Sequence, residues 1–254
     1  MEAINLNGFE LAYTRFGDGV PLVLIHGYPL DHTIWYDVVS PFEKDFTVIL
    51  PDLRGFGLSG VVESQFAISD MAADVAALMD YLNIEAAYIA GHSMGGYVAL
   101  AFVRQYRERT LGLGLVSTQA PADTPERKQG RYDAAEEILR SGVQPVADSM
   151  SPKLSPVEGV QTFVHNLIAS QRPAGLAGAL KAMAERDDST SALSTFKFPV
   201  VILHGGADQL IPVERAQEAK AAIPHATLVT LPGGGHMPMM EEPQKTATAL
   251  KKLL

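Results

Sequence analysis

A short glycine-rich turn around one serine constrains the fold of this chain more than any other feature. The turn is Gly91-His92-Ser93-Met94-Gly95, a G-x-S-x-G pattern. Residues 86–90 before it are typical of a buried strand, and residues 97–103 after it are typical of a helix. A turn this tight needs glycines, because strand and helix approach closely, and it leaves the serine hydroxyl exposed above a sheet. We therefore expect Ser93 to be a nucleophile at a helix N-terminus, where free N–H groups and the helix dipole favour negative charge.

Two further candidate residues follow strand-like runs in the second half of the chain. The apolar run 199–204 ends in a glycine-rich loop that carries Asp208, and the run 226–231 ends in a second such loop that carries His236. Each residue alone is common in turns. Because an acid and a base each follow a predicted strand downstream of the serine, we expect a catalytic triad of Ser93, Asp208 and His236.

A loop near the start of the chain is expected to complete the site. The strand-like run 20–25 is followed by His26-Gly27-Tyr28-Pro29-Leu30. Acyl transfer needs two N–H donors directed at the developing oxyanion, one from the residue after the nucleophile and one from a loop of this kind. We expect the backbone N–H groups of Met94 and Tyr28 to form this oxyanion hole, with the His26 ring bracing the loop.

Five other residues near these loops are candidates for the pocket wall, for the acid or for structural contacts. Trp35 and Met237 are apolar neighbours of the predicted catalytic loops and are expected to line the substrate pocket. Asp123 also follows a strand, but it lies several residues further along, so Asp208 is the preferred acid. Asp52 and Arg54 are interpreted as parts of a loop held by local polar contacts.

Composition excludes several classes of function. The chain has 254 residues, a net charge of −9 and no cysteine. Absence of cysteine excludes disulfides, a thiol nucleophile and thiolate metal ligands, and an acidic chain is not expected to bind nucleic acid. His32, His165 and His225 show no paired metal-ligand spacing, so neither a metal nor another cofactor is predicted. No basic-then-apolar leader and no membrane-length apolar run are visible, so a cytoplasmic protein without a membrane partner is expected. The sequence makes no prediction of oligomeric state.

The order of strand-like and helix-like runs predicts an α/β fold. Alternation through the first half indicates a mostly parallel central sheet flanked by helices, and two closely spaced runs at the start indicate an antiparallel hairpin. Strand-like runs begin near Glu2, Glu10, Pro21, Phe46, Ala86 and Leu111, and helix-like runs cover residues 33–43, 69–82 and 94–106.

The alternation of strand-like and helix-like runs stops between residues 119 and 195. This segment lacks strong strand signals, and helical stretches are expected at residues 125–140, 156–170 and 173–185. We interpret it as a helical cap, residues 119–195, inserted into a core made of residues 1–118 and 196–254. Two final helices are expected at residues 213–223 and 244–254.

Five motifs are spread over nearly the whole chain: H-G-x-P at residues 26–29, D-x-R-G-x-G-x-S at 52–59, G-H-S-M-G-G at 91–96, G-x-x-D at 205–208, and G-H-x4-E-x-P at Gly235, His236, Glu241 and Pro243. In these motifs the chain resembles the α/β-hydrolase superfamily. Within that superfamily it is most similar to small carboxylesterases, cofactor-free bromoperoxidases or perhydrolases, and 3-oxoadipate enol-lactonases, and the loop 27–30 with Trp35 favours the first two groups.

The resemblance implies a serine hydrolase that cleaves a small or medium carboxylic ester through an acyl-enzyme. Lactone hydrolysis and perhydrolysis stay open as alternatives within the same chemistry. A non-catalytic ligand-binding protein with the same fold is the alternative of another class, because a fold does not by itself determine function.

Overall fold

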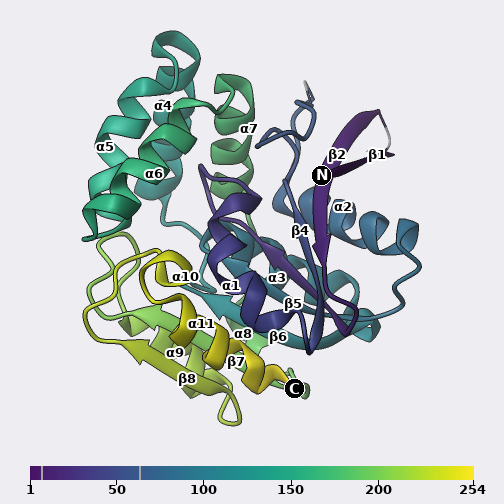
Figure 1. The fold of residues 1–254 in the computed structure, drawn as a ribbon. Helices are drawn as coiled ribbons and strands as arrows, with labels where there is room; N and C mark the ends of the chain where they lie inside the picture. Colours follow the sequence, from purple (N-terminus) through teal and green to yellow (C-terminus); the bar gives the residue numbers. More distant parts are fainter. Residues whose placement is uncertain (7, 63) are drawn as a thin grey trace.

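The computed structural model describes residues 1–6, 8–62 and 64–254. Within these residues, eight strands form one sheet in the order β1-β2-β4-β3-β5-β6-β7-β8 (Figure 1). The strands are β1 Glu2–Leu6, β2 Phe9–Phe16, β3 Val20–Ile25, β4 Phe46–Pro51, β5 Ala87–His92, β6 Thr110–Val116, β7 Val200–Gly205 and β8 Thr227–Leu231.

The pairing of the strands follows the predicted pattern. β1 and β2 form the expected antiparallel hairpin, in which Glu2 pairs with Tyr13 and Leu6 pairs with Phe9. β2 is also antiparallel to β4, whereas the strands from β3 to β8 run parallel. A parallel sheet is covered on both faces, so its strands are continuous apolar runs, as in the fully buried Val200–Gly205. The prediction of an α/β fold with a mostly parallel sheet is confirmed.

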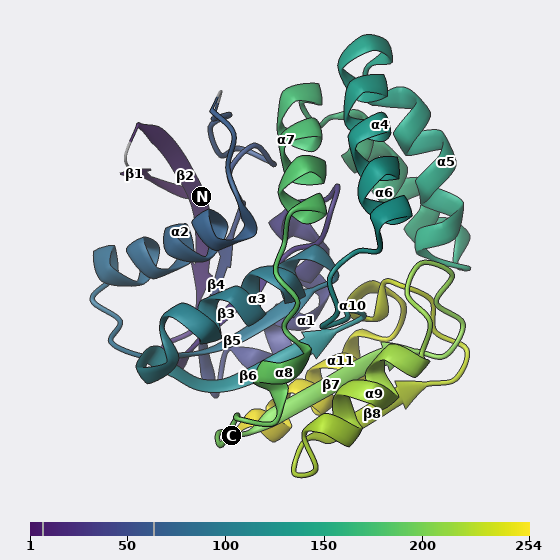
Figure 2. The same ribbon diagram turned by 180° about the vertical axis from the view of Figure 1, so that it is seen from behind.

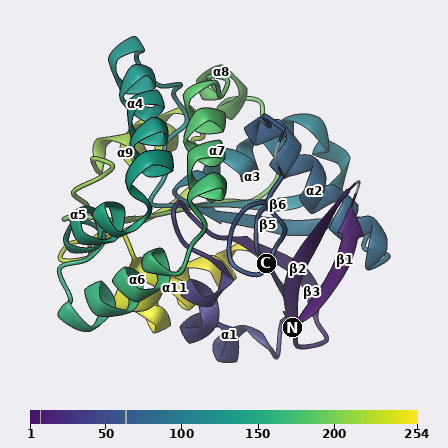
Figure 3. The ribbon, with the colours of Figure 1, turned by 90° about the horizontal axis from the view of Figure 1, so that it is seen from above.

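Helices cover both faces of the sheet. Seen from above, α2 and α3 lie on one side of the sheet and α1 and α11 on the other (Figure 3). The helices are α1 Tyr36–Phe42, α2 Ile68–Tyr81, α3 Met94–Gln105, α4 Pro125–Ser141, α5 Gln144–Leu154, α6 Glu158–Ala169, α7 Pro173–Ala184, α8 Thr190–Leu193, α9 Glu214–Ala222, α10 Pro238–Glu241 and α11 Pro243–Leu250, with 3₁₀ turns at η1 His32–Trp35, η2 Arg107–Arg109 and η3 Lys251–Leu253.

Alternating side chains on each strand supply two separate cores. On β3, Val23 and Ile25 join the core beneath α2 and α3, while Leu22 and Leu24 join the core beneath α1 and α11. This division follows from the two-residue period of a strand, whose successive side chains point to opposite faces. The sheet is therefore packed between two apolar layers, which hold in place the strand ends from which the loops extend.

Between β6 and β7 the chain forms a group of helices that stands above the sheet (Figures 1 and 2). In this group α4 packs against α7, and α5 packs against α6. The predicted helices at 125–140, 156–170 and 173–185 correspond to α4, α6 and α7. The boundaries of a cap domain at residues 118 and 196 stay a prediction.

The sequence interpretation missed two helices between β6 and β7, α5 and the short α8, and it misplaced the start of a helix near residue 33. It did not predict α5, because Pro145 and Pro152 both suggest an interruption. Pro145 is in the first turn, where no intrahelical N–H is required, and α5 buries Ala147 and Leu154. The helix expected at residues 33–43 is a 3₁₀ turn followed by α1. The turn begins at His32, and its N-cap is Asp31, whose carboxylate accepts the N–H of Thr33.

Candidate active site

Ser93 lies where β5 ends and α3 begins, as the sequence predicts. Its backbone has φ 52° and ψ −114°, a conformation that is strained for a residue with a side chain. The neighbouring glycines allow this turn: a Cβ on Gly91 would lie 2.0 Å from the carbonyl oxygen of Gly95. A Cβ on Gly95 would lie 2.4 Å from the carbonyl oxygen of Ile25, at the end of β3. The turn around Ser93 is therefore packed directly against the end of the neighbouring strand.

Asp208 and His236 are in direct contact. The Nδ1 atom of His236 lies 2.7 Å from Oδ2 of Asp208, and the two side chains are 1% and 0% exposed. Their loops follow the adjacent parallel strands β7 and β8. A Cβ on Gly205 would lie 1.9 Å from the carbonyl oxygen of Gly235, so glycine is needed where the two loops cross.

The surroundings of Asp208 stabilise its ionised form. Its Oδ1 atom accepts the N–H groups of Leu210, at 2.8 Å, and Ile211, at 3.0 Å. Burial alone would raise the pKa of Asp208, but the hydrogen bond and the charge of His236, together with these two N–H groups, lower it below its ordinary value. A buried carboxylate next to Nδ1 holds the imidazole in the tautomer that carries its proton on Nδ1.

The main chain of His236 is attached to the serine turn and to the helices above the sheet. Nε2 of His92 donates to the carbonyl oxygen of His236 at 2.8 Å, and the centroids of the two rings lie 4.7 Å apart. The N–H of His236 donates to the carbonyl oxygen of Leu154, at the end of α5. Burial lowers the pKa of His92 well below its usual value, so this ring is neutral. Within the described chain, no hydrogen bond joins the Ser93 hydroxyl to His236.

The N–H groups of Tyr28 and Met94 are free in the described part of the chain. Neither donates a hydrogen bond to a protein group, and Met94 is the first residue of α3. The two segments lie against each other, because a Cβ on Gly27 would lie 2.5 Å from Nδ1 of His92. The peptide bond between Tyr28 and Pro29 is cis. The arrangement offers two unpaired donors beside the serine turn.

His26 braces this loop through its ring. Nδ1 of His26 pairs with the carbonyl oxygen of Gly27 at 3.0 Å, and Nε2 accepts the N–H of Leu53 at 2.9 Å. Burial lowers the pKa of His26, which fits a neutral ring that donates on one side and accepts on the other. His26 therefore connects the loop after β3 with the loop after β4.

The loop after β4 is held by Asp52 and Arg54, as the structural interpretation of the sequence expects. Asp52 accepts the N–H of Leu58 at 2.9 Å. Arg54 binds both carboxylate oxygens of Asp74 and lies over the ring of Phe9, 5.2 Å from its centroid. The contact of Asp52 with Leu58 lies within the loop, whereas those of Arg54 join the loop to α2 and β2, and together they give the two charged residues a structural explanation.

Trp35 and Met237 are both fully buried in the core beneath α1 and α11. Their expected place in the wall of the substrate pocket stays a prediction. Asp123, the rival acid, is bound elsewhere: its carboxylate pairs with Arg131 and, at 2.9 Å, with Arg186. Asp123 therefore joins the entry and exit segments of the helical insertion, and His236 pairs with Asp208.

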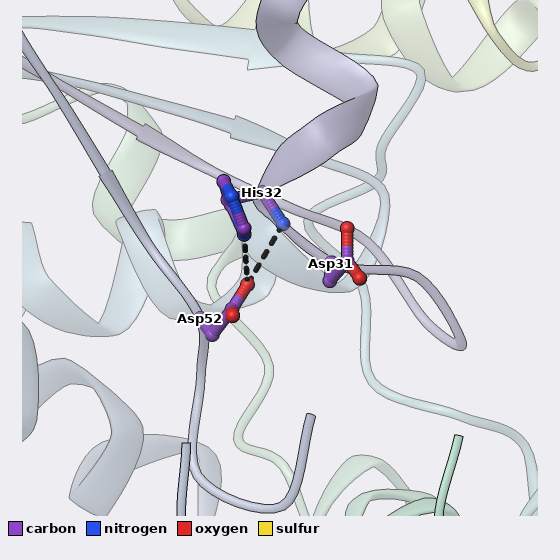
Figure 4. Close-up of side chains that lie close together, drawn as sticks. All are labelled: Asp31, His32 and Asp52. Carbon is purple, nitrogen blue, oxygen red and sulfur yellow. Dashed lines mark hydrogen bonds and ion pairs between the residues drawn. The ribbon is translucent and has the colours of Figure 1, made fainter. Parts of the chain in front are cut away.

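A group of acidic and histidine side chains that the sequence did not reveal lies beside the loop after β3. Asp31, His32 and Asp52 are buried, with potential ligand atoms within 4.8 Å of one another. Figure 4 shows the ring and the main-chain nitrogen of His32 both directed at Oδ1 of Asp52, at 2.7 and 2.9 Å. Nε2 of His32 pairs with the hydroxyl of Tyr36 at 2.8 Å. Because both ring nitrogens have protein partners, we interpret the group as a hydrogen-bonded network that fixes the 3₁₀ turn.

Comparison with known proteins identifies the family. The model of the alpha/beta hydrolase fold matches residues 20–243. The chain belongs to the α/β-hydrolase family. This hydrolase is 32% identical over 242 residues to the AB hydrolase superfamily protein YisY of Bacillus subtilis, covering 90% of this chain and 89% of that protein. It is 27% identical over 263 residues to 3-oxoadipate enol-lactonase 2 of Acinetobacter baylyi, covering 100% and 96%.

A solved structure gives a close match over the whole chain. A thermophilic esterase from Thermogutta terrifontis, with malate bound, superimposes with a TM-score of 0.94 at 36% identity, covering 99% of this chain and 97% of the esterase. The family resemblance stated from the motifs is thus confirmed. Among residues 1–6, 8–62 and 64–254, no helix is both long enough and apolar enough to cross a membrane.

Proposed function

We propose that this α/β-hydrolase is a serine esterase that cleaves small or medium carboxylic esters through an acyl-enzyme. The observation that carries the proposal is the 2.7 Å contact between Nδ1 of His236 and Asp208, in loops that lie next to the strained turn of Ser93. A buried acid–imidazole pair beside a serine at a helix N-terminus is the arrangement that activates a hydroxyl nucleophile.

In the proposed reaction, His236 accepts the proton of the Ser93 hydroxyl while Ser93 attacks the ester carbonyl. Asp208 keeps the imidazole proton on Nδ1 and stabilises the imidazolium that forms. The N–H groups of Tyr28 and Met94, which have no protein acceptor in the described chain, donate to the oxyanion. His236 then protonates the leaving alkoxide and activates a water molecule against the acyl-enzyme. The serine–imidazole hydrogen bond is expected to form with substrate bound, because such contacts are often long in free enzymes.

The test is the hydrolysis of p-nitrophenyl acetate by Ser93→Ala. Removal of the hydroxyl leaves no nucleophile, so we expect turnover to fall to the background rate while circular dichroism and the melting temperature stay close to those of the wild type. Ser191→Ala, at an exposed serine, is the matched control and should keep full activity. If Ser93→Ala retains wild-type turnover, the proposed mechanism is wrong.

Lactone hydrolysis is the second candidate function, and the end-to-end similarity to an enol-lactonase favours it. A lactone is a cyclic ester, so the same groups serve both reactions, and the leaving alkoxide merely stays attached to the acyl group. Initial rates on a panel of linear esters and lactones separate the two. Measurable serine-dependent turnover on neither class would support the non-catalytic alternative.

Perhydrolysis is the third candidate, and the motivation is the Tyr28-Pro29 pair next to the proposed oxyanion hole. Hydrogen peroxide would replace water in the attack on an acetyl-enzyme and release peracetic acid. Peracid formation from acetate and peroxide is measured in the wild type and in Pro29→Leu. Absence of peracid where ester hydrolysis is robust excludes this activity, and equal rates in the two proteins exclude only the role of Pro29.

A further inference from the structure

The three backbone N–H groups centred on His236 all have acceptors, and two of the acceptors belong to one side chain. The N–H of Gly235 donates to Oε2 of Glu241 at 2.5 Å, and the N–H of Met237 donates to Oε1 of Glu241 at 3.2 Å. The N–H of His236 itself donates to the carbonyl oxygen of Leu154 at 2.9 Å. Both oxygens of one carboxylate therefore hold the residues on either side of the imidazole.

Local structure brings Glu241 back to this loop. α10 is a single short turn that starts at Pro238, and the N–H of Glu241 donates to the carbonyl oxygen of Met237 at 2.9 Å. The loop has little space to adjust, because a Cβ on Gly235 would lie 2.9 Å from Oε1 of Glu241 and 2.7 Å from Cδ of Pro156. The carboxylate thus lies directly against the main chain that it binds.

We propose that Glu241 is a positioning residue for His236, an inference that rests on the proposed role of His236 as general base. By fixing the backbone on both sides, Glu241 sets the direction of the imidazole, so that Nδ1 meets Asp208 and Nε2 faces the serine turn. Proton transfer depends steeply on such geometry: a displacement of 1 Å can cost about 10²-fold in rate. Glu241 acts through His236 and has no part in the chemistry of the bond that breaks.

The chemistry of the contact explains why a carboxylate is suited to this position. An ionised carboxylate offers two acceptor oxygens and no donor, so it satisfies two N–H groups at once. Glutamine offers one oxygen and one NH₂ group, so in Glu241→Gln one of the two N–H groups would face a donor. Glu241→Ala would leave both without an acceptor.

The test compares kcat and KM for p-nitrophenyl acetate in Glu241→Gln, Glu241→Ala and a matched control. Glu242→Gln is the control, because Glu242 is the next residue and, within the described residues, its half-exposed side chain pairs with Lys245 on the surface. We expect kcat to fall by about 3- to 10-fold in Glu241→Gln and by about 10- to 100-fold in Glu241→Ala, with KM changed by less than about twofold. Glu242→Gln should match the wild type.

A second readout does not depend on turnover. We expect the proton between Nδ1 of His236 and Asp208 to give a far-downfield ¹H NMR resonance, which should shift or broaden in Glu241→Gln and stay in place in Glu242→Gln. A purely structural role for Glu241 would lower the melting temperature and leave both kcat and this resonance unchanged in the folded protein.

The outcomes separate this inference from the proposed function. If Ser93→Ala is inactive but folded Glu241→Gln keeps the kcat and the resonance of the control, the positioning role is wrong and the esterase mechanism stands. If Ser93→Ala is as active as the wild type, the proposed function fails first. If Glu241→Ala does not fold, the resonance in Glu241→Gln alone decides whether Glu241 positions His236.

Discussion

Replacement of Asp208 by asparagine tests the proposed acid in a way that follows directly from its hydrogen bonds. Oδ1 of Asp208 accepts two backbone N–H groups, from Leu210 and Ile211, and Oδ2 contacts Nδ1 of His236. An asparagine must place its amide oxygen at the Oδ1 position, since only an acceptor suits two N–H groups. Its NH₂ group then replaces Oδ2 and faces the imidazole.

This orientation forces the wrong tautomer on His236. Nδ1 must present a lone pair to the NH₂ group, so the imidazole proton moves to Nε2, where the base should accept the proton of Ser93. We expect kcat to fall by about 10⁴-fold, which corresponds to about 5.5 kcal/mol in the activation free energy. The assay is steady-state hydrolysis of p-nitrophenyl acetate, with circular dichroism to confirm the fold.

Asp123→Asn is the matched control, because Asp123 is also a buried aspartate that follows a strand. Its carboxylate is 0% exposed and pairs with Arg186 and Arg131, and these pairs lower its pKa although burial alone would raise it. Removal of the charge from a buried pair costs about 3–5 kcal/mol, so the melting temperature should fall by about 10 °C with kcat little changed. A folded Asp208→Asn variant with kcat within tenfold of the wild type would refute the assignment of the acid.

Three further predictions concern stability and substrate. Burial lowers the pKa values of His26, His92 and His204, so unfolding takes up protons below about pH 6.5. Each of these histidines should therefore remove up to about 1.4 kcal/mol from the free energy of unfolding per pH unit of acidification. A urea midpoint that is unchanged from pH 7 to pH 5 would contradict this prediction. Gly95→Ala places a Cβ 2.4 Å from the carbonyl oxygen of Ile25 and should destabilise the protein. Gly130→Ala, in open space on α4, should instead stabilise it by about 0.5–1 kcal/mol. Similar melting temperatures for the two variants would contradict the packing argument. Short soluble esters should be cleaved faster than emulsified long-chain triglycerides, and kcat/KM across acyl chain lengths checks this.

The places of Ser93, Asp208 and His236 in the fold could be predicted from the sequence because they depend on topology. The carboxyl ends of parallel strands meet at one edge of a sheet, so Ser93, Asp208 and His236 had to lie near that edge once their strands were recognised. The glycines next to them mark close approaches of the backbone, as where Gly205 crosses Gly235. These signals are local, and they do not depend on how the rest of the chain packs.

Contacts made by main-chain atoms could not be predicted in this way. The carbonyl of Leu154 that accepts the N–H of His236 has no sequence signal, because every residue carries the same group. α5, which supplies this carbonyl, was itself missed because of its prolines. Glu241 was recognised only as part of a motif, and its role became visible once its two oxygens were located beside Gly235 and Met237.

The helices above the sheet contact both the loop that carries His236 and the loop after β4. Leu154 holds the main chain of His236. On the other side, a Cβ on Gly175 would lie 2.0 Å from the carbonyl oxygen of Gly55, and the side chain of Gln171 accepts the N–H of Gly57 at 3.0 Å. The insertion is therefore in contact with the loop of His236, the proposed base, and with the loop that His26 braces. Substitutions at these contacts should alter kcat as well as KM, because they act on the position of the reacting groups, whereas substitutions that only shape the pocket should act mainly through binding.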